Sequence, residues 1–69
     1  MTLKEWCEGK RQEDVAADLG VDQSYLSRLI SGESVGGHAT VMRIAEMTDG
    51  AVTYEDMVRA AANYRAALA

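Results

Sequence analysis

The chain has no proline and no phenylalanine, and it holds one cysteine and one histidine. A single cysteine excludes a disulfide within the chain, and one cysteine with one histidine cannot complete a closed zinc site. The core must therefore be built from Leu, Ile, Val, Met and Ala. Because Cys7 lies beside Trp6 on an apolar face, we expect a buried, unreactive thiol, and an unpaired thiol fits a reducing, cytoplasmic setting.

Long apolar runs are also missing from the sequence. No run approaches the roughly 18 residues that a membrane-crossing helix needs, and no signal peptide is recognisable. The patterns typical of enzymes are missing too, namely a Ser-His-acid set, paired carboxylates in an apolar setting, a phosphate-binding glycine loop and a metal-ligand cluster. We therefore expect no catalysis, no cofactor, no metal ion, no small-molecule ligand and no membrane partner.

What the chain does have is enough apolar material for one small domain. Its 69 residues are 48% hydrophobic, so we expect a single domain over residues 1–69. Acidic residues outnumber basic ones by 11 to 7, which gives a net charge of −4. Because phosphate contacts supply much of the affinity of DNA-binding proteins, this balance argues mildly against nucleic acid as a partner. Local charge distribution decides the matter, since Lys4, Lys10 and Arg11 lie together near the N-terminus.

Glycine separates the helical patterns, and the chain is predicted to be all-α with five helices. The expected helices cover residues 2–8, 12–19, 23–31, 39–48 and about 54–68. Thr2 and Glu5 have the spacing of a capping box, Asp22 has the chemistry of an N-cap, and Thr53 starts the last helix. Helical periodicity places these residues inward: Leu3, Trp6, Cys7, Val15, Ala16, Leu19, Leu26, Leu29, Ile30, Val41, Ile44 and Ala45. Val52, in the turn before the last helix, is also expected to face the core.

Residues 12–32 have the pattern of a DNA-binding helix-turn-helix. Ala16 is small where the two helices cross closely, Gly20 permits the tight turn, and Val21 fills the corner between the helices. The exposed positions of the second of these helices are short and polar, and folding alone does not require that. Four of them can reach base edges or phosphates from a helix in the major groove: Gln23, Ser24, Ser27 and Arg28.

Residues 12–32, followed by the pattern of residues 41–57, resemble the Cro/YdaS-like phage regulators of the lambda-repressor-like superfamily. The resemblance implies a compact five-helix domain, repression at a pseudo-palindromic operator, a homodimer, and autoregulation in a bacterial host cell. It also implies that Gln12 contacts a phosphate and braces Gln23, which reads an adenine. The chain departs from the family pattern at Gly36 and Gly37, where relatives often have proline, and in its longer last helix.

The expected site residues fall into two groups. Base contacts are assigned to Gln23, Ser24, Ser27 and Arg28, and backbone contacts to Lys10, Arg11, Gln12, Tyr25 and Ser31. For Lys10 and Arg11 the alternative is ordinary solvated charge. The lone His38 is interpreted as a helix-entry residue or a phosphate neighbour, because no second ligand accompanies it.

Two questions stay open on the sequence. Met57, Ala61, Tyr64 and Leu68 have 4-3-4 spacing, which suits either a seam with a partner subunit or packing on the protein's own core. The alternatives are balanced for Met57 and Ala61, whereas Tyr64 and Leu68 favour the partner. The rival function is a protein-binding module, such as an inhibitor or antitoxin-like protein, whose acidic surface meets a basic partner.

Overall fold

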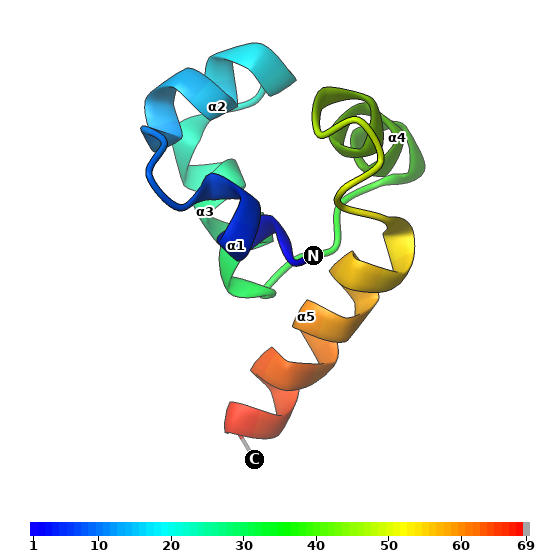
Figure 1. The fold of residues 1–69 in the computed structure, drawn as a ribbon. Helices are drawn as coiled ribbons and strands as arrows, with labels where there is room; N and C mark the ends of the chain where they lie inside the picture. The colour runs from blue at the N-terminus through cyan, green and yellow to red at the C-terminus, as the bar shows by residue number, and fades with distance from the viewer. Residues whose placement is uncertain (69) are drawn as a thin grey trace.

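The computed structural model describes residues 1–68, and this part of the chain contains five α-helices and no strand. The helices are α1 (Leu3–Cys7), α2 (Gln12–Leu19), α3 (Gln23–Ser31), α4 (His38–Met47) and α5 (Tyr54–Leu68). In Figure 1, α1, α2 and α3 form one side of the molecule, α4 lies on the other, and α5 runs below them towards the C-terminus. The predicted all-α class and the five helices are confirmed, and α4 lies one residue earlier than expected.

Reciprocal hydrogen bonds fix the starts of the first and last helices. The Thr2 hydroxyl accepts a hydrogen bond from the Glu5 N–H at 3.1 Å, while Glu5 Oε1 accepts one from the Thr2 N–H at 2.9 Å. At α5, the Thr53 hydroxyl accepts a hydrogen bond from the Asp56 N–H at 3.2 Å, and the Asp56 carboxylate accepts one from the Thr53 N–H at 3.0 Å. The predicted capping box is confirmed, and each pair satisfies amide groups that have no partner within the helix.

A single apolar cluster holds the five helices together. Its buried members are Leu3, Cys7, Val15, Ala16, Leu19, Leu26, Leu29, Ile44, Val52 and Met57. Each of these residues except Met57 was predicted from the sequence to face inward. Trp6, Ile30 and Ala45 are only half-buried. Burial raises the pKa of the Cys7 thiol, which keeps it protonated, and the nearby charge of Lys10 opposes this only in part.

The burial of Met57 decides between the two interpretations of the last helix at this position, a seam with a partner subunit and packing on the protein's own core. Its side chain is 1% exposed and belongs to the protein's own core, so it is not available to a partner subunit. Ala61 and Tyr64 are half-buried on the same side of α5, and Leu68 is 70% exposed. Packing on the core therefore accounts for the beginning of this stripe.

The connection from α4 to α5 depends on one buried polar side chain. The Thr48 hydroxyl donates to the Ile44 carbonyl at 2.8 Å and accepts from the Val52 N–H at 3.1 Å. Thr48 is 5% exposed, so both bonds form away from water, where an unpaired polar group is costly. They position Val52 in the core and direct α5 across the other helices.

None of the helices in residues 1–68 combines the length and the apolar character that crossing a bilayer requires.

Candidate nucleic-acid interface

The turn between α2 and α3 sets the geometry of the site. Gly20 adopts a left-handed backbone conformation with φ at +77°, and the Val21 N–H donates to the Ala16 carbonyl at 3.0 Å. This closes α2 and lets the chain reverse direction before α3 begins. Asp22 occupies the N-cap position of α3, as predicted, but its side chain makes no capping hydrogen bond.

The outer face of α3 carries the four predicted base-contacting residues. Gln23, Ser24, Ser27 and Arg28 are exposed, and positions i, i+1, i+4 and i+5 share one side of a helix. The opposite side is anchored by Leu26 and Leu29, which are both fully buried. These four polar side chains therefore project from a helix whose other side is held by the core.

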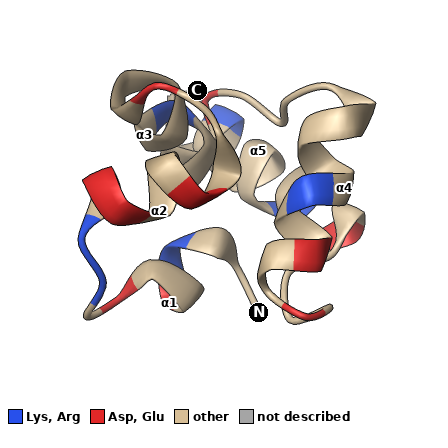
Figure 2. Ribbon diagram, turned by 90° about the horizontal axis from the view of Figure 1, so that it is seen from above, with Lys and Arg blue, Asp and Glu red and all other residues tan. Residues whose placement is uncertain are grey.

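Charge is distributed unevenly between the two helices of the motif. Arg28 is the only charged residue of α3, whereas α2 carries Glu13, Asp14 and Asp18 on its exposed surface. Figure 2 shows these acidic segments on α2 and the opposite sign on α3. The net negative charge of the chain thus coexists with a helix α3 that has no acidic group.

The predicted backbone-contacting residues before α2 already have partners in the chain. Lys10 Nζ donates to the Trp6 carbonyl at 3.0 Å and lies 4.4 Å from the centre of the Trp6 ring. Arg11 pairs with Glu13 at 2.8 Å, with both side chains largely exposed, so this pair contributes little to stability. Gln12 is exposed at the first position of α2.

Tyr25 and Ser31 both contact the loop after α3, and only Ser31 also lies on the outer face of the helix. Tyr25 is half-buried, and its hydroxyl lies 3.1 Å from where a Cβ on Gly36 would be. The Ser31 hydroxyl donates to the Arg28 carbonyl at 3.1 Å and accepts from the Glu33 N–H at 3.3 Å. Both side chains lie at the exit from α3. Ser31 is exposed one turn after Ser27 and shares the outer face with the four residues above, whereas Tyr25 lies on a different side of the helix.

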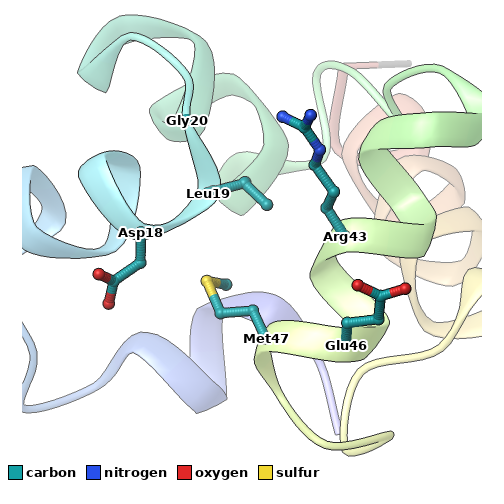
Figure 3. A pocket seen from close by; sticks show the side chains of 6 residues that line it. All are labelled: Asp18, Leu19, Gly20, Arg43, Glu46 and Met47. Carbon is teal, nitrogen blue, oxygen red and sulfur yellow. The ribbon is translucent and has the colours of Figure 1, made fainter.

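Arg43 is a further positively charged residue beside the α2–α3 turn, and the sequence patterns did not indicate it. It reaches from α4 towards the turn of the motif, and its Nη1 lies 3.3 Å from where a Cβ on Gly20 would be. Figure 3 shows the open pocket that it borders, with Leu19 and Gly20 on one side and Glu46 and Met47 on α4. Its guanidinium faces the C-terminal end of α2, where carbonyl groups carry partial negative charge. No local pattern signals this position, because it depends on where α4 packs.

His38 is the first residue of α4 and is exposed, and Gly37 before it provides no side-chain cap. Within residues 1–68, no group of three or more His, Cys, Asp or Glu side chains is arranged to hold a metal ion.

Comparison with known families agrees with this geometry. A family model described as helix-turn-helix matches residues 3–49, which is more than half of the 69 residues and includes α1 to α4. The chain therefore belongs to the helix-turn-helix family of lambda-repressor- and Cro-like proteins. Its class is that of DNA-binding transcription regulators. No curated protein and no solved structure gave a significant match.

Proposed function

We propose that this protein is a sequence-specific repressor of the Cro type, which binds a pseudo-palindromic operator as a homodimer. The observation that carries the proposal is the outer face of α3. It presents Gln23, Ser24, Ser27 and Arg28 together, without an acidic residue, on a helix anchored by buried leucines. A surface of this kind suits the major groove, where polar side chains read base edges.

Each side chain on this face matches a hydrogen-bonding group on the DNA. The amide of Gln23 matches the N6 donor and N7 acceptor of adenine, and the guanidinium of Arg28 matches the O6 and N7 acceptors of guanine. Ser24 and Ser27 are short enough to let α3 approach the bases, and each hydroxyl can bond to a base or a phosphate. These residues would supply sequence selectivity.

Affinity would come from contacts with the phosphates on either side of the groove. We assign these contacts to Lys10, Arg11, Gln12, Tyr25 and Ser31. The ammonium of Lys10 uses one of its three donors on the Trp6 carbonyl, so two remain for a phosphate. Arg11 would exchange its exposed partner Glu13 for a phosphate at little cost, because surface ion pairs are weak.

Repression would follow from occupancy of a promoter by the dimer. Two copies related by a two-fold axis place their recognition helices about 34 Å apart, which is one turn of B-DNA. An operator within the protein's own promoter would make the regulation autogenous, as the family resemblance implies.

The test is selection of bound duplexes from a random pool at near-physiological salt, followed by sequencing. We expect an enriched inverted repeat with half-sites about 10 base pairs apart. Arg28→Ala should abolish or shift the enrichment, whereas Arg65→Ala, which removes an exposed arginine from the last turn of α5, should retain it. The two variants lose the same charge, so their difference isolates the recognition face.

Absence of enrichment from a folded protein would contradict the proposal. The acidic surface of α2, with Glu13, Asp14 and Asp18, would then favour the second candidate function, a module that binds a basic protein partner. Charge-neutral variants of these three residues should weaken that partner's binding and leave DNA binding no worse.

A further inference from the structure

The turn between α1 and α2 folds the side chain of Lys10 back onto Trp6. The Lys10 N–H donates to the Cys7 carbonyl at 3.0 Å, and Gly9 within this turn has φ at +79°. The Lys10 ammonium donates to the Trp6 carbonyl at 3.0 Å and lies 4.4 Å from the centre of the Trp6 ring. One side chain thus makes a charge-assisted hydrogen bond and a cation–π contact with the same residue.

The residue that receives this ammonium is itself fixed by the rest of the fold. Trp6 is half-buried and packs against the apolar cluster, in which Leu3 and Cys7 of the same short helix are buried. The Trp6 N–H donates to the Thr2 carbonyl at 3.0 Å. The ring and the carbonyl that hold Lys10 therefore belong to a part of the molecule that the core keeps in place.

Arg11, the neighbouring cation, is held in a different way. Its guanidinium pairs with Glu13 at 2.8 Å, and the two side chains are 77% and 58% exposed. A pair of this kind is weak, because both side chains are mobile and water screens their charges. Within residues 1–68, no carboxylate pairs with Lys10. Of the two cations before α2, only Lys10 is therefore held by neutral groups that a phosphate need not displace.

The held ammonium lies beside the helix that would cross the DNA backbone. Lys10 stands two residues before Gln12, the first residue of α2, and Figure 2 shows the basic segment that joins α1 to α2. A free lysine side chain loses much rotamer freedom when a partner fixes it, and that loss weakens binding. The contacts with Trp6 remove most of this freedom before DNA arrives, while two ammonium donors remain for a phosphate.

We propose that Trp6 is a positioning residue for DNA binding, whose ring and carbonyl hold the Lys10 ammonium ready for a phosphate at the N-terminal end of α2. This inference rests on the proposed function, which assigns Lys10 to a phosphate and gives Trp6 no role. Trp6 itself contacts no DNA, and its contribution passes through Lys10. Because a ring face and a neutral carbonyl hold the ammonium, its positive charge stays available to the phosphate.

The first test asks whether Trp6 acts through Lys10. Trp6→Leu removes the ring face and keeps an apolar side chain and the backbone carbonyl. We expect it to weaken operator binding about two- to fivefold for each copy in the complex, the range of an exposed cation–π contact. In a Lys10→Ala background the same substitution should have no further effect, whereas in an Arg11→Ala background its effect should be undiminished. Equal effects in all three backgrounds would overturn the proposal.

A conservative substitution separates the ring from general packing. Trp6→Phe keeps a ring face for the ammonium and should recover most of the binding that Trp6→Leu loses. Urea unfolding measures the stability of both variants, because each also loses contacts with the apolar cluster. Operator binding as weak in Trp6→Phe as in Trp6→Leu would mean that the ring does not position Lys10.

The unmodified chain offers a spectroscopic test that needs no substitution. Protons above the face of an aromatic ring resonate at high field, and the ε-methylene protons of Lys10 adjoin the ammonium over the Trp6 ring. We expect these protons to be shifted to high field in the free protein and to keep that shift when the operator binds. Loss of the shift on the operator would show that Lys10 leaves Trp6 to reach the DNA, which overturns the proposal.

The outcomes distinguish this inference from the proposed function. If an inverted repeat is enriched and Trp6→Leu binds it as tightly as the unmodified chain does, Trp6 has no positioning role and the repressor function stands. If no repeat is enriched, the repressor function fails. The same variants can then be compared on an arbitrary duplex at low salt, because phosphate contacts do not depend on base sequence. A folded chain that binds no duplex at low salt overturns both.

Discussion

At the scale of single residues, the outer face of α3 separates selectivity from stability. The side chains of Gln23, Ser24 and Ser27 are exposed and make no hydrogen bond within residues 1–68, so folding does not depend on them. Leu26 and Leu29 on the opposite side are fully buried, and truncating either would leave a cavity in the core. Substitutions on the outer face should therefore change DNA binding without changing the unfolding free energy.

Gln23→Ala tests this separation. The variant should bind the selected operator more weakly by about 1–3 kcal/mol and should lose preference at one base pair of each half-site, because its amide no longer pairs with a base. Titration of the operator and of single-base variants measures both effects. Asn63→Ala removes an exposed amide from α5 and serves as the control, with no expected change. Unchanged selectivity in Gln23→Ala would remove this residue from the base contacts.

At the scale of helices, the ends of the elements depend on a few specific contacts. Gly32 ends α3 with φ at +90° and lies against the backbone of α5. A Cβ at this position would collide with the carbonyl oxygen of Ala60 and lie 2.8 Å from its carbonyl carbon. The absence of a side chain here is what permits α3 and α5 to cross so closely.

Gly32→Ala should destabilise the protein far more than Gly9→Ala. Both glycines have positive φ, at +90° and +79°, so both variants incur the left-handed strain of about 1–2 kcal/mol. Only at Gly32 does the added methyl group also meet a helix backbone, since nothing lies within 4 Å of the position at Gly9. Urea unfolding should show a modest loss for Gly9→Ala and a loss of several kcal/mol for Gly32→Ala, roughly the range of overpacked sites. Equal losses would mean that α5 yields at the contact.

The hydrogen bonds at the start of α5 should make the free energy of unfolding depend on pH in the acidic range. The Thr53 N–H donates to the Asp56 carboxylate and holds the pKa of that group below its ordinary value of 3.8. A lowered pKa in the folded state stabilises the protein above the pKa of the unfolded chain, and the contribution is lost as the pH falls through the folded value. Asp56→Asn should therefore lower the urea midpoint at neutral pH and flatten its decline below about pH 4. Asp18→Asn, on the exposed surface of α2, should keep that decline.

At the scale of the whole molecule, a net charge of −4 limits attraction to DNA in general. The cations assigned to the interface are Lys10, Arg11 and Arg28, and the acidic side chains of α2 follow the first two of them along the chain. We expect weak binding to arbitrary duplexes, so that discrimination depends on the contacts of α3 rather than on a basic surface.

The salt dependence of operator binding measures this expectation. Two cationic phosphate contacts per copy, from Lys10 and Arg11, predict a slope of log K against log salt of about −4 for a dimer. Lys10→Ala should make the slope less steep by about 2 for a dimer and weaken binding to all sequences alike. Lys4→Ala, which removes an exposed lysine of α1, should leave the slope unchanged. A slope that is the same in Lys10→Ala would exclude Lys10 from the phosphate contacts.

The sequence by itself determined the local parts of this protein. The turn at Gly20, the reciprocal cap of Thr2 and Glu5, and the inward faces of α2 and α3 follow from backbone sterics, hydrogen-bonding groups at helix ends and the helical period. These operate within a few residues of each other. The exposed polar face of α3 was predictable for the same reason, as it is what remains once Leu26 and Leu29 face inward.

Only the tertiary structure decided which face of α5 is covered. The helix carries one apolar stripe through Met57 and Tyr64 and another through Tyr54 and Val58, and periodicity gives no reason to prefer either. The angle at which α5 leaves the Thr48 turn and crosses α3 at Gly32 places Met57 in the core and leaves Tyr54 and Val58 in water. That angle depends on contacts between residues far apart in the chain. For the same reason, local sequence patterns could not predict that Arg43 approaches Gly20.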